Sequence, residues 1–249
     1  MSVETVFVVG NKFKHFAENA NVMLFNQLED ALANGQLQPR NVRVHWGQGV
    51  AESDINRLLN TYEGLSKSAL GGLLPVRAGR RHVHKHVSHN GMISMPRRLT
   101  QTTFEVDVLL DERCAEMSDH VTGQHIQGMV LTEATRQTFL AVTEEFYLKE
   151  VAHSSYFVIN CMDVEYLRFV FPLPISIHYE VLDHSVSQRS GSQRFDVRMS
   201  VIQGQQLCCV VKTKFATYPD AVIAEKEAGL AKAAIAQEIA PEMLHELRA

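Results

Sequence analysis

The first third of the chain alternates between short apolar runs and segments with helical spacing. The run TVFVV (5–9) is typical of a buried strand, and apolar residues at intervals of three and four predict a helix over 14–34. The segments NVRVHW (41–46) and ESDINRLLNTY (52–62) repeat this order. Strand, helix, strand and helix in succession favour a small α/β unit with parallel strands over residues 1–65.

A different pattern follows residues 66–80, which are rich in glycine and which we interpret as a linker. The segment TTFEVDVLL (102–110) alternates as a strand. Residues 128–147 then predict one long helix that is apolar on nearly every side. Because a helix of this kind has no face that prefers water, we expect it to be buried.

Four more strand candidates come after this helix, and Gly204 predicts a tight hairpin between the last two. They are SYFVINC (155–161), ISIHYEVL (175–182), QRFDVRMSVI (193–202) and QLCCVVKTKF (206–215). The order predicts an α+β domain over residues 81–220, in which one antiparallel sheet curls round the long central helix. Residues 221–249 predict a C-terminal helix that is broken near Pro241.

Three polar residues lie on one face of the predicted buried helix. Glu133, Arg136 and Gln137 are spaced i, i+3 and i+4, so their side chains are neighbours. A buried carboxylate without a partner is strongly unfavourable, so Glu133 must be paired or used in chemistry. A pair between Glu133 and Arg136 that serves only the fold would also explain the pattern.

The segment before the helix favours a functional interpretation. It supplies His120 and His125 in a loop, while Gly123 and Gly128 let the backbone approach a ligand closely. The first amides of the helix would face the same space and are suited to hold a developing oxyanion. A histidine, a carboxylate and a helix N-terminus that converge on one pocket indicate acyl chemistry.

The residues DHVTGQHIQGMVLTEATRQ (119–137) resemble a family signature, D-H-x-x-G-x-H-x-x-G-M-x-L-x-E-A-x-R-Q. It belongs to the hotdog-fold family that makes A-factor-type γ-butyrolactone signals. VHKHVSHNGMIS, from Val83, resembles the opening strand of that family, and FEVDVLLDE resembles the strand that follows. The resemblance extends over about residues 82–150, and to about 217 by strand pattern.

The resemblance implies a hotdog fold and an acyltransferase of signal or secondary-metabolite biosynthesis. Members of the family transfer a β-ketoacyl group from acyl carrier protein to the hydroxyl of dihydroxyacetone phosphate, a reaction that needs no cofactor. We extend the expected donors to coenzyme A thioesters. The family usually has two hotdog repeats and this chain has one, so we expect a homodimer.

The expected catalytic residues are Glu133, His120 and Arg136. Glu133 or His120 would take the proton of the attacking hydroxyl, and Arg136 would position Glu133 or bind an acceptor phosphate. Amides near Gly128 would hold the thioester oxyanion, and Gln137 would orient the reacting groups. The candidate substrate-binding residues are Gly123, His125, Gly128 and Gln137, with Lys85 and His84 in second rank.

Two other thioester reactions and one non-catalytic role stay open. His120 and Glu133 occupy the places of the acid–base pair in β-hydroxyacyl-carrier-protein dehydratases, whose proline-rich loop is absent here. A thioesterase would release free thiol without an acceptor. A third possibility is an acyl-binding or partner-binding module that has no turnover.

Other histidine, arginine and glycine patterns are explained without further chemistry. His82, His84 and His86 would share one face of a strand, which we interpret as a polar face rather than a metal site, because no cysteine or carboxylate joins them. Gly10 after the first strand lacks the rest of a dinucleotide motif, so we expect it to serve packing. Arginines between 77 and 98 form a solvated face or a dock for an acidic carrier protein.

Composition narrows the classes of partner. A formal net charge of −4 over 249 residues argues against a general nucleic-acid binder. No run approaches the apolar length of a membrane span. The four cysteines form no C-x-x-C pair, so we expect reduced thiols in a cytoplasmic protein.

Overall fold

The N-terminal unit is a three-stranded parallel sheet with order β2-β1-β3 and two helices packed on one face. The computed structural model describes residues 4–62, 65, 75–149 and 155–246, so most of the predicted linker lies outside the described residues. The elements of this unit are β1 (Glu4–Val9), η1 (Phe16–Glu18), β2 (Val22–Leu24), α1 (Phe25–Ala33), η2 (Pro39–Asn41), β3 (Val42–Trp46) and α2 (Glu52–Thr61).

The helix predicted over residues 14–34 is wrong in its first half, because α1 begins only at Phe25. Asn21 has a left-handed backbone (φ 60°), which ends any helical run before it. Its carbonyl accepts a hydrogen bond from the amide of Phe7 on β1. The chain after Asn21 therefore joins the sheet as β2 instead of continuing as a helix.

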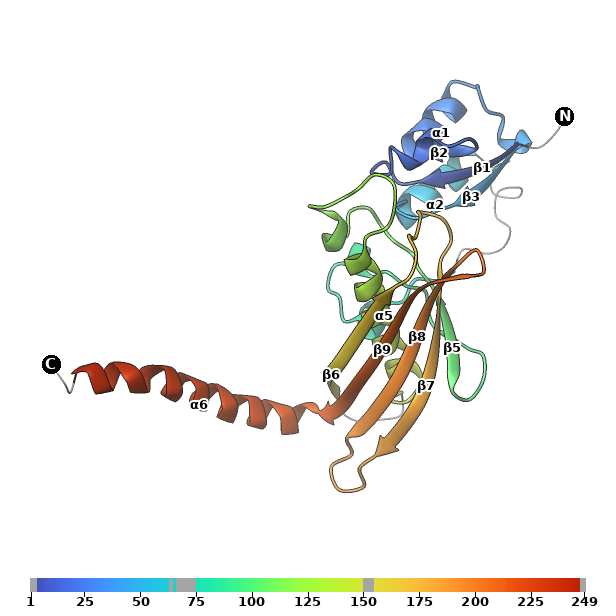
Figure 1. The fold of residues 1–249 in the computed structure, drawn as a ribbon. Coiled ribbons are helices and arrows are strands. Elements are labelled where there is room, and N and C mark those ends of the chain that lie inside the picture. The colour runs from blue at the N-terminus through green and yellow to red at the C-terminus, as the bar shows by residue number, and fades with distance from the viewer. Residues whose placement is uncertain (1–3, 63–64, 66–74, 150–154, 247–249) are drawn as a thin grey trace.

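The second unit is a six-stranded antiparallel sheet, in the order β4-β5-β7-β8-β9-β6, that curls round the long helix α5 (Figure 1). This arrangement confirms the predicted α+β hotdog fold. The elements are α4 (Arg80–Val83), η3 (Ser88–Asn90), β4 (Arg97–Arg98), β5 (Thr103–Asp107), η4 (Ala115–Met117), α5 (Gly128–Phe146), β6 (Ser155–Tyr166), β7 (Ser176–Val186), β8 (Gln193–Gln203), β9 (Gln206–Pro219) and α6 (Asp220–Glu246).

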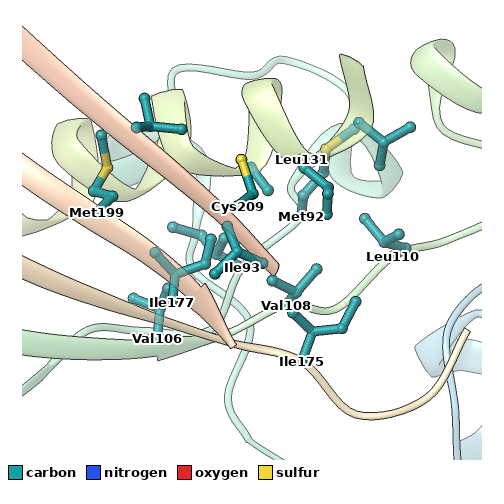
Figure 2. Packing of buried hydrophobic residues seen from close by; sticks show 14 of the residues in the cluster. Met92, Ile93, Val106, Val108, Leu110, Leu131, Ile175, Ile177, Met199 and Cys209 are labelled. Carbon is teal, nitrogen blue, oxygen red and sulfur yellow. The ribbon is translucent and has the colours of Figure 1, made fainter. Parts of the chain in front are cut away.

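Alternation along the strands places the apolar side chains between the sheet and α5. Phe195, Val197, Met199 and Val201 of β8 are all buried, as the period of two predicts. Figure 2 shows Leu131 of α5 lying over side chains that come from several strands. Gly204 and Gln205 join β8 to β9 with positive φ at both positions, which matches the predicted tight hairpin.

The strand expected over residues 82–89 is wrong. Residues 80–83 form the short helix α4, and His84 after it has a left-handed backbone (φ 53°). His82 and His84 face carboxylates at the end of α5, at 3.1 Å from Glu145 and 3.0 Å from Glu144. These contacts hold residues 82–84 against α5. Strand pairing at this edge of the sheet begins only near Ile93, with an isolated bridge to Val108 and then the pairing of β4 with β5.

The C-terminal helix α6 runs without interruption from Asp220 to Glu246, so the break predicted near Pro241 is wrong. It leaves the end of β9 and extends away from the body of the molecule (Figure 1). Among the described residues, none of the helices is long and apolar enough to cross a membrane.

The two units are joined along the ends of β1 and β3. A side chain at Gly10 would place its Cβ 2.6 Å from the carboxylate of Glu112 and 2.7 Å from the carbonyl of Gly49. Gly49 and Asp111 also form an isolated parallel bridge. Residues of the hotdog unit therefore fill the edge where a nucleotide would bind in an open α/β sheet. Gly10 serves packing, as the sequence indicates.

Gln48 ties the two units through its buried side chain. Its Nε2 donates to the carbonyl of Val108 at 2.9 Å, and its Oε1 accepts from the amide of Leu110 at 2.8 Å. Both bonds cross from the end of β3 to the segment after β5. They give the N-terminal unit a fixed position on the hotdog unit.

We expect Gln48→Leu to lower the free energy of unfolding by about 2–3 kcal/mol, because two buried backbone groups lose their partners. Urea unfolding of the full chain measures this change. Gln36→Leu, at an exposed position of the same unit, is the matched control and should be nearly neutral. Equal unfolding free energies for the two variants would show that Gln48 does not tie the units together.

Candidate functional site

Glu133 is held by three side chains. The Arg136 guanidinium binds its two carboxylate oxygens at 2.7 and 2.9 Å, in a bidentate pair. The ammonium of Lys85 lies 2.9 Å from Oε1, and the amide of Gln137 donates to the same oxygen at 2.9 Å. The Glu133 side chain is 15% exposed, so the carboxylate is largely but not completely removed from water.

Gln137 connects this carboxylate to the segment before the sheet. It is wholly buried. Its Oε1 accepts from the amide of Met92 at 2.7 Å, and its Nε2 donates to the carbonyl of Asn90 at 2.8 Å. The residue therefore fixes the loop over 90–92 on α5 while it also orients Glu133. Its position is structural as well as part of the candidate site.

Glu116 joins the site although nothing in the sequence pattern singled it out. Its Oε1 lies 3.1 Å from Nζ of Lys85, which thus bridges Glu116 and Glu133. The other oxygen of Glu116 is buried and has no hydrogen-bond partner among the described residues. We call Lys85, Glu116, Glu133, Arg136 and Gln137 the Glu133 cluster.

The cluster is electrically balanced, with two carboxylates and two cations. Burial alone would raise the pKa of Glu133, but the hydrogen bonds from Arg136 and Gln137 outweigh it and the pKa is lowered. Burial alone would lower the pKa of Lys85, but the bonds to Glu133 and Glu116 raise it. Glu133 is therefore an ionised carboxylate at neutral pH, paired with charged Lys85 and Arg136.

A cleft of about 510 Å³ opens at the first turn of α5. We call it the α5 cleft. It is lined by His125, Ile126, Gly128, Leu131, Tyr166, Leu167, Arg168, Phe169 and Val170. Most of these side chains are apolar or aromatic, as is usual for a pocket that takes an acyl chain.

Gly128 begins α5 at the wall of this cleft. A Cβ at this position would lie 2.7 Å from the ring of Tyr166, whose hydroxyl bonds to Thr132 at 2.7 Å. The glycine therefore allows the tyrosine ring to pack on the first turn of the helix. The amides of Gly128 and Met129 precede the first intrahelical hydrogen bonds, which begin with Val130.

His125 is the histidine that the structure brings to the α5 cleft. Its Nδ1 lies 3.3 Å from the hydroxyl of Thr122, and its ring centroid lies 4.9 Å from that of Phe169. The contact with Thr122 orients the ring and leaves Nε2 as the nitrogen available to a ligand. The aromatic contact sets the side of the cleft on which the imidazole lies.

Three other predicted site residues lie elsewhere. His120 is exposed, and its carbonyl accepts a hydrogen bond from Gln127. Gly123 has φ +77°, and a Cβ there would lie 2.9 Å from the ring of His15, so it packs on the N-terminal unit. His84 pairs with Glu144 near the opposite end of α5. The structure brings none of these three to the cleft or to the Glu133 cluster.

The α5 cleft and the Glu133 cluster lie on neighbouring sides of the same helix. Thr132 lies between them on the helical wheel, and Met129 and Arg136 lie next to it at 69% and 29% exposure. Beside this face, β6 is an edge strand that, among the described residues, pairs only with β9. Tyr166 of β6 covers Thr132 on this face, whereas the side chain of Met129 is exposed in a single chain.

Among the described residues, no group of three or more histidine, cysteine, aspartate or glutamate side chains is arranged to hold a metal ion. The four cysteines are free thiols, of which Cys161 is exposed and the others are buried.

The comparison with family models gives one match. The model of the A-factor biosynthesis hotdog domain matches residues 73–219. The match contains all of the Glu133 cluster and all of the residues that line the α5 cleft. No curated protein matches the chain.

Several solved structures are similar to part of the chain. A candidate thioesterase from Shewanella oneidensis is 15% identical, with 51% of this chain and 84% of that chain covered and a TM-score of 0.39. A thioesterase from Haemophilus influenzae is 14% identical, with 70% and 94% covered and a TM-score of 0.36. A mutant thioesterase from Pseudomonas aeruginosa is 15% identical, with 51% and 81% covered and a TM-score of 0.35.

We expect Glu133→Gln to reduce both the stability and its dependence on pH. The neutral side chain leaves Arg136 without its counter-charge and Lys85 with Glu116 alone, which should cost about 2–4 kcal/mol at neutral pH. Because the pKa of Glu133 is lowered by folding, the carboxylate stabilises the wild-type fold above its unfolded pKa. This contribution is lost as the pH falls through the folded pKa.

Urea unfolding from neutral pH down to about pH 3 tests this expectation, since that range spans the titration of a carboxyl group. The unfolding free energy of the variant should fall less steeply than that of the wild type. Glu180→Gln, at an exposed position of β7, should follow the wild-type curve. Parallel curves for wild type and Glu133→Gln would contradict the assignment of an ionised, paired carboxylate.

Proposed function

The chain belongs to the A-factor biosynthesis hotdog domain family, and from this premise we propose that it is an acyltransferase. The proposed donor is a β-ketoacyl thioester of acyl carrier protein or coenzyme A. The proposed acceptor is the hydroxyl of a small phosphorylated alcohol of the dihydroxyacetone phosphate type. The product would serve signal or secondary-metabolite biosynthesis, as the family description indicates.

One observation supports this proposal most directly. An apolar cleft of about 510 Å³ opens at the first turn of α5, and both His125 and Gly128 line it. An acyl chain fits the apolar wall, and the thioester carbonyl would then lie at the helix N-terminus. Backbone amides at such a terminus stabilise the negative charge that develops on a carbonyl oxygen during acyl transfer.

The proposed step forms one bond and breaks one. The acceptor hydroxyl oxygen bonds to the carbonyl carbon, and the C–S bond of the thioester breaks. The hydroxyl proton passes to Nε2 of His125 and then to the leaving thiol, so no proton is gained or lost overall. We assign to His125 the role that the sequence suggested for His120, because His125 lines the cleft and His120 is exposed elsewhere.

The Glu133 cluster would receive the acceptor. Arg136 and Lys85 are 29% and 22% exposed, so each cation keeps a side from which a phosphate can approach. The lowered pKa of Glu133 makes it a weak base. We therefore assign it to orienting the acceptor hydroxyl and the two cations, with Gln137 as a further positioning residue.

A second copy of the chain would complete the site. Met129 is exposed on the α5 face beside the cleft and the cluster, and the 12 residues of β6 form, among the described residues, the outer edge of the sheet next to it. An unpaired strand of this length is a template for pairing with another chain. We propose a two-fold homodimer in which the β6 strands pair antiparallel, so that each copy closes the α5 face of the other.

Turnover with purified protein tests the acyltransferase. Mass spectrometry of a β-ketoacyl carrier-protein thioester mixed with dihydroxyacetone phosphate should show the ester, or the butenolide formed from it. We expect His125→Gln to reduce kcat by about 10²-fold or more, the usual size of an acid–base contribution. Arg136→Lys should raise the KM for the acceptor more than it lowers kcat, because lysine loses the bidentate geometry.

Glu180→Gln is the matched control and should keep wild-type turnover, since the side chain is exposed on β7. Free thiol released without ester would replace the proposal with a thioesterase. Thioester binding without any turnover, across a panel of phosphorylated alcohols, would replace it with an acyl-binding module.

Cys161 tests the dimer, because it is the exposed cysteine and lies near the middle of β6. In a symmetric antiparallel β6 pair the two copies of Cys161 lie close together across the two-fold axis. A short bismaleimide should therefore link the wild-type chain into a covalent dimer at micromolar protein. Cys161→Ser should remove this product and keep the dimer mass in light scattering. A monomer mass for the wild type would contradict the proposed assembly.

A further inference from the structure

The C-terminal helix begins beside the start of the unpaired edge strand. Pro219, the last residue of β9, pairs with Ser155, the first residue of β6. Because β6 is the outermost strand on this side of the sheet, α6 starts at the corner of the sheet. Figure 1 shows α6 leaving this corner on the side of β6 that faces away from the sheet.

The first turns of α6 are anchored, which fixes its direction. Ile223 is 6% exposed and packs against the body of the protein. The hydroxyl of Tyr156 on β6 makes a side-chain hydrogen bond with Glu227, which raises the pKa of that tyrosine. The main contacts of α6 with other elements are with β6 and β9. The helix is thus held over the edge of the sheet at its base.

Beyond this base, α6 exposes apolar side chains. Leu230, Ile235 and Ile239 are 61%, 59% and 46% exposed, and the side chains described from Glu225 to Ile239 are all exposed. Leu230 lies on a different side of the helix from Ile235 and Ile239, about 140° or more away. A partner that covers Leu230 therefore packs on one side of α6.

Two-fold symmetry identifies what α6 would meet. When two β6 strands pair antiparallel, the start of one strand lies beside the end of the other. The end of the partner copy's β6 is followed by Leu167 and Phe169, which are 42% and 69% exposed. Both residues line the α5 cleft. When the two strands overlap along their full length, the side of α6 that carries Leu230 and the apolar rim of the cleft are therefore brought to the same corner of the dimer.

The lengths agree with this placement. Leu230 is 10 residues after the start of α6, or about 15 Å along the helix. Phe169 is three residues beyond the end of β6, or about 10 Å in extended chain. Within one chain the two ends of β6 are separated by about 36 Å. The helix therefore reaches the cleft rim of a second copy and not that of its own chain.

We propose that α6 of each chain packs on the rim of the α5 cleft of a second copy, with Leu230 against Phe169. This inference rests on the β6-paired dimer proposed above. Phe169 contacts His125, so the partner helix would form one wall of the cleft and help to hold the imidazole. Each proposed acyl site would then contain residues of both chains.

Cysteine pairs on separate chains test this contact. Two tagged chains are co-expressed in a Cys161→Ser background, one with Leu230→Cys and the other with Phe169→Cys. A short bismaleimide should link the two tags when both cysteines are present, and neither variant alone should form a linked dimer. Ser185→Cys, at an exposed position of β7 far along the sheet, replaces Leu230→Cys in the control and should give no link.

The possible outcomes distinguish a wrong placement of α6 from the absence of the β6 dimer. Linkage through native Cys161 without linkage between positions 230 and 169 would keep the β6 dimer and overturn the placement of α6. Absence of both links, with a monomer mass, would remove the dimer and the inference together. Leu230→Lys adds a measurement without cross-linking: it should raise the KM for the thioester several-fold and leave the Cys161 link intact. An unchanged KM would also overturn the placement.

Discussion

The ion pairs of one buried carboxylate set the arrangement of this hotdog unit. Glu133 lies on the central helix, which the sheet must bury, so its charge needs partners. Arg136 comes from the same helix, but Lys85 comes from a distant segment and is also bound by Glu116. To supply that lysine, residues 83–92 cross over α5 instead of joining the sheet, and Gln137 locks them there. The ion pairs of Lys85 with the two carboxylates therefore outweigh the preference of this segment for a β-strand.

Features that depend on residues close together in the sequence could be predicted, whereas features that depend on contacts between distant segments could not. Period-two alternation located β7 and β8, and the i, i+3, i+4 spacing placed Glu133, Arg136 and Gln137 together. These signals are local. Glu116 could not be found, because it reaches Glu133 only through Lys85, and no spacing rule connects three separate segments. The strand β2 was missed because one left-handed asparagine interrupts an otherwise helical pattern.

In the small N-terminal unit, the edge of the sheet that would usually bind a ligand contacts the hotdog unit instead. In open α/β sheets the ends of the parallel strands usually form a crevice for ligands. Here Gly10, Gln48 and Gly49 at those ends bind the segment after β5 instead. That segment leads through Glu116 towards the loop of His125, so the N-terminal unit supports the chain that carries the candidate site. In the sequence, a glycine that allows such close packing cannot be distinguished from a glycine that allows a phosphate to bind.

One side of α5 lines the apolar cleft and a neighbouring side carries the Glu133 cluster. This division is relevant to the choice between hydrolysis and acyl transfer. Hydrolysis needs only the cleft, a histidine and water. A balanced pair of cations and carboxylates beside the cleft adds nothing to that reaction, yet it suits an acceptor that brings its own phosphate. Under the proposed function, such an acceptor would gain binding energy that water lacks, and this energy would hold its hydroxyl at the thioester carbonyl. The charge balance of the cluster then has a simple meaning: each cation already has a partner, and under the proposed function a phosphate would bind on the side of Lys85 and Arg136 that stays open to solvent.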